Sequence, residues 1–285
     1  MHLRAAASRA ATLLTRNPSL FCRIALAKLN TARPMPPLPA KRRIRNVVFE
    51  CGLPDYRGAA PMYFGSYALL VVHAMERMLK PGDVFFDVGA NIGYLSAVAA
   101  SLVGPQGQIH AFEPVSAHCA RLRQLAEANP DYRIAVNCCA AGETAGMAKL
   151  YVTREAGQST MVARYKSAPE IASIAEVPVV RLDSYIAERR LGRIALIKID
   201  AEGFELPVLK GLSRYLGAGG QRPPILCEIA PRAYPLMGRK PGELAAYMSA
   251  FGYKACDLVD ASTPVDLGSL RRVEDVLFLP ASRQE

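Results

Sequence analysis

The sequence contains no tryptophan, no Cys-x-x-Cys pair and no long hydrophobic segment. A helix that spans a bilayer needs about 20 consecutive apolar residues, and the longest apolar runs here, such as 68–74, are soon interrupted by charge. The seven cysteines show no spacing typical of a zinc site, and the acidic residues do not combine with histidines at ligand spacing. We therefore expect a cytoplasmic protein with reduced cysteines, without a metal ion and without a transmembrane helix.

Acidic residues are also absent from the first 49 positions. Ten lysines and arginines lie within residues 1–45, and the rest of the chain holds 25 basic and 25 acidic residues. The net charge of +10 thus describes a basic N-terminal arm, broken by prolines between residues 34 and 39, and argues against a nucleic-acid groove on the folded body. We assign the arm to 1–45 and one domain to 46–285. The arm fits an amphipathic helix on an anionic membrane, an organelle presequence or a disordered tail.

From residue 67 onward, helix and strand patterns alternate. Helical spacing covers 67–80, and the continuous apolar run Val84–Val88 is typical of a strand buried on both faces. Further strands are predicted at 108–112, 133–136, 149–153, 177–182, 194–199, 225–229, 253–258 and 276–279, and further helices at 115–128, 183–190, 206–215 and 243–251. This alternation predicts an α/β fold with a mostly parallel sheet and helices on both faces. The last two strands lack a helix between them, so we expect them to be antiparallel.

The most informative motif is Asp87-Val-Gly-Ala-Asn-Ile-Gly-Tyr94, which follows a buried strand and begins a helix. Glycines in such a turn let backbone amides approach a ligand closely. The Asp87 carboxylate would repel a pyrophosphate and attract a ligand with a cationic ammonium and sulfonium. The next strand ends at Glu113, whose carboxylate can accept hydrogen bonds from both hydroxyls of a ribose. The predicted cofactor-binding residues are Asp87, Gly89, Asn91, Gly93, Tyr94, Glu113, Pro114 and Asn137.

A second acidic block, Lys198-Ile-Asp200-Ala-Glu202-Gly, follows another buried strand. Ligands bind at the carboxyl ends of strands in open α/β sheets, so we expect Asp200 at the ligand edge. Lys198 and Asp200 project to the same side of the strand, and Glu202 lies on the following turn. A carboxylate there can remove or orient the proton of an alcohol, which makes Asp200, Lys198 and Glu202 the candidate catalytic residues. The alternative is that the three form a structural ion-pair network next to the following helix.

Together these motifs resemble those of the FkbM family of S-adenosylmethionine-dependent methyltransferases. The resemblance lies in Asp87 to Gly93, Phe112-Glu-Pro114, Val180-Arg-Leu-Asp-Ser184 and the block from Ile197 to Glu205, in which Ala201 stands where the family usually has valine. It implies a Rossmann-like class I methyltransferase fold, with a mostly parallel seven-stranded sheet and an antiparallel last strand. It also implies S-adenosyl-L-methionine as the cofactor and O-methylation of a small-molecule, sugar or lipid-linked hydroxyl.

Two other functions stay open at this stage. The chain could be a non-catalytic, methyltransferase-like binding protein. It could also be an oxidoreductase with a nucleotide cofactor, although the loop from Gly89 to Gly93 lacks the Gly-x-Gly-x-x-Gly of such enzymes. Other segments are candidates for a pocket wall or for simple packing. They are the aromatic residues Tyr56, Tyr63, Phe64 and Tyr67. The segment from Gly157 to Thr160 is a candidate for the pocket border, whereas His118 is expected to be solvated.

Overall fold

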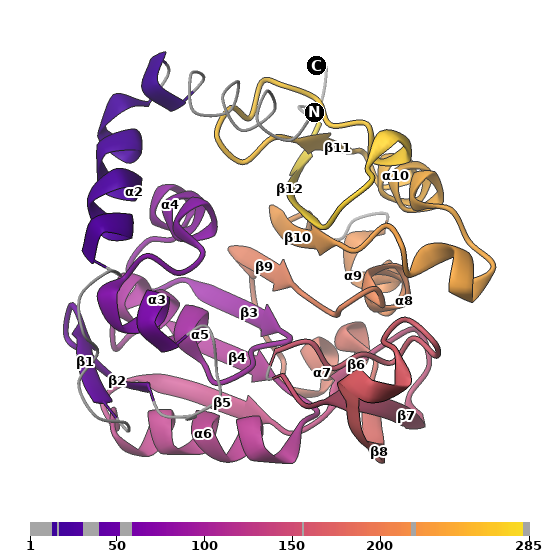
Figure 1. The fold of residues 1–285 in the computed structure, drawn as a ribbon, viewed down its shortest axis with the longest axis horizontal. Helices are drawn as coiled ribbons and strands as arrows, with labels where there is room; N and C mark the ends of the chain where they lie inside the picture. The colour runs from indigo at the N-terminus through magenta and orange to yellow at the C-terminus, as the bar shows by residue number, and fades with distance from the viewer. Residues whose placement is uncertain are drawn as a thin grey trace.

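The computed structural model describes residues 13–15, 17–30, 40–51, 59–155, 157–217 and 221–281. Its central sheet has seven strands in the order β11-β12-β10-β9-β3-β4-β5 (Figure 1). They are β3 (Val84–Val88), β4 (Gln108–Phe112), β5 (Arg133–Asn137), β9 (Leu196–Ile199), β10 (Ile225–Ile229), β11 (Tyr253–Cys256) and β12 (Glu274–Pro280). Strand β12 is antiparallel to both neighbours, and the other neighbouring pairs are parallel. The predicted α/β class, the mostly parallel sheet and the reversed last strand are confirmed.

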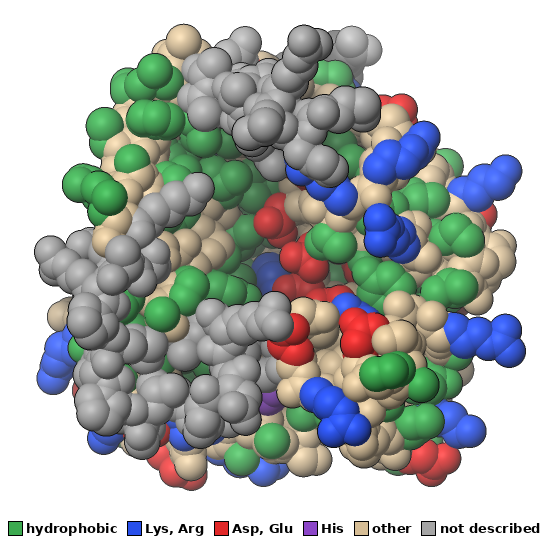
Figure 2. Space-filling view, viewed as in Figure 1, with side chains coloured by type: hydrophobic (Ala, Val, Ile, Leu, Met, Phe, Trp, Pro, Cys, Tyr) green, Lys and Arg blue, Asp and Glu red, His purple; other side chains and the backbone are tan. Residues whose placement is uncertain are grey.

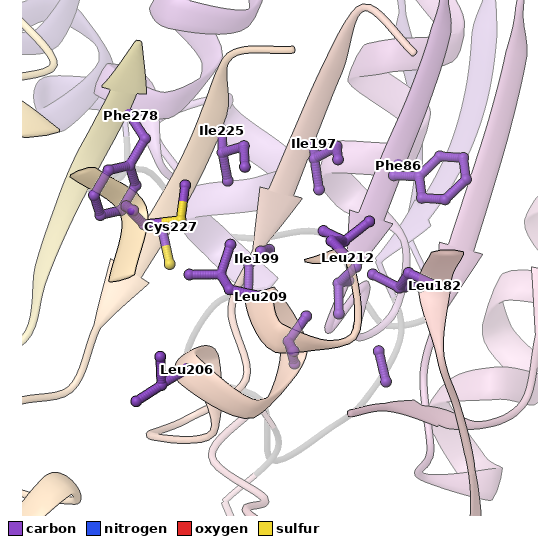
Figure 3. Close-up of a cluster of buried hydrophobic side chains, with 14 of the residues drawn as sticks. Phe86, Leu182, Ile197, Ile199, Leu206, Leu209, Leu212, Ile225, Cys227 and Phe278 are labelled. Atoms are coloured by element: carbon purple, nitrogen blue, oxygen red, sulfur yellow. The ribbon is translucent and has the colours of Figure 1, made fainter. Parts of the chain in front are cut away.

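Helices cover both faces of this sheet, because successive side chains of a buried strand point to opposite sides. Phe85 belongs to a hydrophobic cluster with α4 (Leu69–Met78) and α5 (Tyr94–Val103). Phe86 belongs to a second cluster, drawn in Figure 3, on the opposite face. The helices of that face are α7 (Leu182–Glu188), α8 (Glu205–Lys210), α9 (Ser213–Leu216) and α10 (Pro241–Ala250), whereas α6 (Ser116–Glu127) packs beside β5. No helix in the described part of the chain is both long and apolar enough to cross a bilayer.

An N-terminal layer packs beside α4 and α5. It consists of α2 (Pro18–Asn30), the hairpin β1 (Ala40–Ile44)–β2 (Val47–Cys51) and α3 (Ala59–Phe64). A helix in the arm was one of the predicted alternatives, whereas the hairpin and α3 were not predicted. The hairpin strands pair along their whole length, so the expected boundary between residues 45 and 46 falls in the hairpin turn. Helix α2 packs through Leu20 against Val259. The other residues of the predicted arm, 1–12, 16 and 31–39, lie outside the described residues.

Between β5 and α7 the chain forms a separate small sheet. Its strands β6 (Ala140–Ala141), β7 (Gly146–Thr153) and β8 (Ile171–Val180) have the order β6-β8-β7. They include the predicted strand 149–153 and residues 177–180 of the predicted strand 177–182, whose last residue begins α7 instead. The loop between β7 and β8 folds back on β7, where the backbones of Tyr151 and Thr160 exchange two hydrogen bonds of 2.8 and 3.1 Å. This inserted sheet therefore carries an anchored loop.

The predicted helix 206–215 is divided into α8 and α9 at Gly211. The carbonyl of Gly211 accepts the amide of Asp183 at 2.9 Å. A Cβ at Gly211 would lie 2.2 Å from the carbonyl oxygen of Gly142, so the close approach of the inserted sheet requires glycine at this position.

One expectation about the cysteines is wrong. Cys119 of α6 and Cys138, which follows β5, form a disulfide with their Cα atoms 5.7 Å apart. The other five cysteines are free, and four of them are buried. The disulfide joins α6 to the residue after β5, which is the next element along the chain, at a sequence separation of 19.

Candidate functional site

The turn after β3 brings the ends of three strands together. The amides of Gly89 and Ala90 donate to the carbonyl of Phe112 at the end of β4, each at 3.0 Å. The amide of Asp200, after β9, donates to the carbonyl of Val88 at 2.9 Å. Gly89 has φ +78°, and a Cβ there would lie 1.8 Å from the carbonyl oxygen of Asp200. The glycine thus permits the close contact between the first motif and the second acidic block.

Glu113 organises this turn with its side chain. Its Oε2 accepts the amide of Asn91, and its Oε1 accepts the amide of Val115, each at 2.8 Å. The residue is 5% exposed and lines the pocket described below. Each carboxylate oxygen can accept two hydrogen bonds. The backbone contacts therefore fix the carboxylate and leave acceptor capacity for the hydroxyls of a ligand.

Asp87 is wholly buried at the end of β3. Its Oδ2 accepts a hydrogen bond from Ser96 Oγ at 2.6 Å, whereas its Oδ1 has no hydrogen-bond partner among the described residues. Burial raises the pKa of Asp87, and the positive charge of Lys198 opposes that rise. Leaving a buried acceptor without a donor costs roughly 1–3 kcal/mol. Asp87 is therefore suited to a ligand that brings a hydrogen-bond donor, above all a cationic one.

The second acidic block contains a short ion pair. Lys198 Nζ lies 2.9 Å from Asp200 Oδ2, and the Lys198 side chain is buried. The register of β3 and β9 places Lys198 beside Asp87, so one ammonium faces carboxylates from two strands. Burial lowers the pKa of Lys198, but the carboxylates of Asp200 and Asp87 more than reverse this effect and raise it above its usual value. Lys198 is therefore cationic and holds Asp200 in place.

Glu202 occupies the turn after β9 with a left-handed backbone, φ +47°. Its carbonyl accepts the Thr160 hydroxyl at 2.7 Å, and its carboxylate lies 3.2 Å from Lys166 Nζ. Burial, and then the charge of Asp200, raise the pKa of Glu202 to about 7, while Lys166 opposes the rise. A carboxyl group that titrates near neutral pH is well matched to accept a proton from a bound alcohol.

Glu228 of β10 completes this acidic group. Carboxylate oxygens of Asp200, Glu202 and Glu228 lie within 4.8 Å of one another. The charge of Asp200, and then burial, raise the pKa of Glu228 well above its usual value, while Lys198 opposes the rise. The ammonium of Lys198 supplies positive charge beside these carboxylates.

A single pocket joins the turn after β3 to the second acidic block. Figure 2 shows acidic side chains gathered around a hollow near the centre of one face. Among its lining residues are nine of those predicted from the sequence. They are Asp87, Gly89, Asn91, Tyr94, Glu113, Pro114, Lys198, Asp200 and Glu202.

Two predicted cofactor-site residues, Gly93 and Asn137, do not line the pocket. Gly93 precedes α5 with φ +88°, and a Cβ there would lie 2.7 Å from Leu122 of α6, so this glycine serves helix packing. Asn137 donates from Nδ2 to the carbonyls of Ala111 and Ala135, at 3.1 and 3.3 Å. Its side chain links β4 to β5.

The sequence makes the segment from Gly157 to Thr160 a candidate for the pocket border, favours packing for Tyr56 and Tyr67, and places His118 in solvent. Tyr67 and the loop residues Gly157 and Ser159 line the pocket, whereas Tyr56 lies outside the described residues. His118, expected to be solvated, is buried instead, with Nδ1 3.6 Å from Glu113 Oε1. The first turn of α6 packs back on the end of β4, and that contact could not be read from the local sequence. Met62 and Met161 also line the pocket, and no local signal marked them.

Comparison with known proteins agrees with the order of these motifs. The sequence profile described as "Methyltransferase FkbM domain" matches residues 87–255. The chain is 34% identical over 168 residues to "31-O-demethyl-FK506 methyltransferase FkbM" of Streptomyces tacrolimicus, a match that covers 49% of this chain and 62% of that protein. It is 32% identical over 149 residues to "Methyltransferase 1" of Beauveria bassiana, with coverages of 46% and 59%. The matches thus span less than two thirds of either relative.

Two solved structures show a weaker overall likeness. A methyltransferase FkbM from Methylobacillus flagellatus matches with a TM-score of 0.42 and 15% identity, over 92% of this chain and 60% of that one. An Aeropyrum pernix fibrillarin, solved with S-adenosyl-L-methionine, matches with a TM-score of 0.40 and 13% identity, with coverages of 70% and 67%.

Proposed function

The chain belongs to the FkbM methyltransferase family, and on that premise we propose that it transfers a methyl group from S-adenosylmethionine to a hydroxyl of a small-molecule, sugar or lipid-linked acceptor. The observation that carries the proposal is the single pocket in which Asp87, Gly89 and Glu113 face Asp200 and Glu202. The name of the Streptomyces relative, a methyltransferase of 31-O-demethyl-FK506, supports an oxygen acceptor.

The residues present fit this cofactor. Asp87 offers a buried oxygen without a donor, as a cationic amino acid moiety requires, and Glu113 is fixed with lone pairs to spare for ribose hydroxyls. Gly89 and Asn91 give the turn its left-handed backbone next to Glu113. When bound, S-adenosylmethionine supplies an electrophilic methyl group.

On the acceptor side, we assign different roles to the two carboxylates. Asp200 is held by Lys198 and orients the acceptor hydroxyl as a hydrogen-bond acceptor. Glu202 takes the hydroxyl proton as the oxygen–carbon bond forms, because its pKa of about 7 leaves it partly ionised and able to accept a proton. Lys198 is a positioning residue that acts through Asp200.

The test uses S-adenosylmethionine with a tritiated methyl group and fractionated extracts of small molecules and lipids. We expect label in a fraction that contains a hydroxylated compound, and we expect the label to survive alkaline hydrolysis, because an ether resists base whereas a methyl ester does not. Asp200→Asn protein serves as the control for background labelling. Cofactor binding without transfer to any fraction would instead support the non-catalytic alternative.

We also propose that the N-terminal segment contacts an anionic membrane. Helix α2 buries Leu20 and Ala27, yet Leu26 and Leu29 are 61% and 70% exposed. Together with exposed Cys22, these leucines follow the i, i+4, i+7 spacing of one helix face, and the helix contains basic but no acidic residues. An outward apolar helix face is typical of helices that lie on lipid surfaces.

A further inference from the structure

The loop between β7 and β8 is the part of the inserted sheet that reaches the pocket. Among the described residues, strands β6, β7 and β8 pair with one another and not with the central sheet, which therefore does not need them for its own hydrogen bonds. Gly157, Ser159 and Met161 nevertheless line the same pocket as Asp87 and Asp200. The insertion therefore contributes a wall to the site rather than an edge to the sheet.

Two side chains of the same loop contact Glu202 and so hold the turn that carries it. Thr160 is 1% exposed, and its hydroxyl donates to the carbonyl of Glu202 at 2.7 Å. Lys166 Nζ lies 3.2 Å from Glu202 Oε2 and donates to Gln158 Oε1 at 3.1 Å. Since the backbone of Thr160 also pairs with Tyr151, these contacts form a continuous link from β7 to the acidic block.

The turn at Glu202 needs such support. A left-handed backbone costs a residue other than glycine roughly 1–2 kcal/mol, and conformations of this kind persist where surrounding contacts hold them. On the other side, a Cβ at Gly203 would lie 2.2 Å from Cβ of Ala233 and 3.5 Å from a methyl group of Val162. The turn is therefore enclosed between the loop and the segment after β10.

We propose that the loop between β7 and β8 belongs to the catalytic apparatus, with Lys166 and Thr160 as positioning residues that hold Glu202 toward the acceptor. This inference rests on the proposed role of Glu202 in methyl transfer. The Thr160 hydroxyl fixes the backbone of Glu202, and the Lys166 ammonium fixes its carboxylate and favours the ionised form. Lys166 itself is held over the ring of Tyr165, 4.9 Å from its centroid.

The charge on Glu202 depends on groups from every element around it. They are Lys198 of β9, Asp200 directly after β9, Glu228 of β10, and Tyr165 and Lys166 of the loop, while Glu205 accepts the amide of the neighbouring Gly203. Burial and Asp200 raise the pKa of Glu202, whereas Lys166 and then Lys198 lower it. Removal of the Lys166 charge must therefore raise this pKa, and the pH above which Glu202 is a competent base must rise with it.

The test follows the Glu202 carboxyl directly by carbon-13 NMR of protein labelled in its glutamate carboxyls, with Glu202→Gln to identify the signal. The expected midpoint in the unaltered protein is about 7. In Lys166→Met it should rise by about 1 unit or more, because an opposite charge at this distance lowers a carboxyl pKa by about 1–3 units. Lys166→Arg should keep the original midpoint, and so should Lys149→Met, which removes an exposed lysine of β7.

An unchanged midpoint in Lys166→Met would overturn the proposal, and Lys166→Gln provides the same test if the methionine variant does not fold. Thr160→Val, which removes a hydrogen bond and no charge, should raise the midpoint by a smaller amount as Glu202 moves away from Lys166. A purely structural role of Lys166 would lower the unfolding temperature without moving the midpoint. The titration needs neither cofactor nor acceptor, so failure to bind S-adenosylmethionine would contradict the proposed function separately.

Discussion

Replacement of Gly89 by alanine tests whether the contact between the β3 turn and Asp200 builds the site. Gly82 provides a matched control, because it too has a left-handed backbone, φ +88°, but a Cβ there would have no neighbour within 4 Å. Both substitutions incur the cost of an alanine with positive φ, roughly 1–2 kcal/mol. Only Gly89→Ala also forces its Cβ against a backbone oxygen that lies 1.8 Å away.

The difference between the two variants isolates the steric cost. Overpacking of this kind costs about 1–3 kcal/mol. Since 1 kcal/mol shifts the unfolding midpoint of a domain of 150–250 residues by about 2–4 °C, Gly89→Ala should unfold about 2–12 °C below Gly82→Ala. The Gly89 variant should also bind S-adenosylmethionine about tenfold more weakly or worse, because the turn and Asp200 must separate, whereas Gly82→Ala should bind normally.

Thermal unfolding and titration calorimetry measure the two effects on the same samples. Equal unfolding temperatures and equal affinities in the two variants would refute the argument, because they would show that Gly89 matters only for its backbone conformation. Normal affinity with lowered stability in Gly89→Ala would place the turn outside the cofactor site.

Three further outcomes are expected. Glu113→Ala should weaken S-adenosylmethionine binding by about 1.5–3 kcal/mol, because a hydrogen bond to a charged acceptor contributes about that much. Unchanged affinity in calorimetry would show that Glu113 does not bind the cofactor. Asp200→Asn should lower turnover about 100-fold or more while cofactor affinity persists; unimpaired turnover with a sharp loss of thermal stability would favour the structural ion-pair interpretation. Replacement of Leu26 and Leu29 by glutamine should reduce sedimentation with phosphatidylserine vesicles at low salt, whereas Leu236→Gln, which changes an exposed leucine outside α2, should not; equal sedimentation of all three proteins would rule out the α2 surface.

The central strands were predictable because strands buried on both faces are continuous apolar runs between turn residues. The predicted bounds of Val84–Val88, Gln108–Phe112 and Ile225–Ile229 match the structure. Strand β1 was missed because its exposed residues, Lys41 and Arg43, are basic, so the segment resembled a charged arm. The segment is a strand because it pairs with β2, and the local sequence pattern does not predict that pairing.

In the candidate site, too, some residues could be placed from the sequence and some contacts could not. Asp87, Glu113 and Asp200 could be placed at one edge because parallel strands carry their carboxyl ends to the same side of a sheet. The role of Gly93 in packing against α6, the burial of His118 and the contact between Lys166 and Glu202 depend on approaches between distant segments. Spacing in the sequence does not encode such approaches.

Titration calorimetry of the unaltered protein with S-adenosylmethionine, S-adenosylhomocysteine and NAD⁺ tests the central claim most directly. We expect the first two to bind at one site per chain and NAD⁺ not to bind, because the buried Asp87 carboxylate favours a cationic moiety and repels a pyrophosphate. Binding of NAD⁺ at comparable affinity, or no binding of S-adenosylmethionine, would contradict the account.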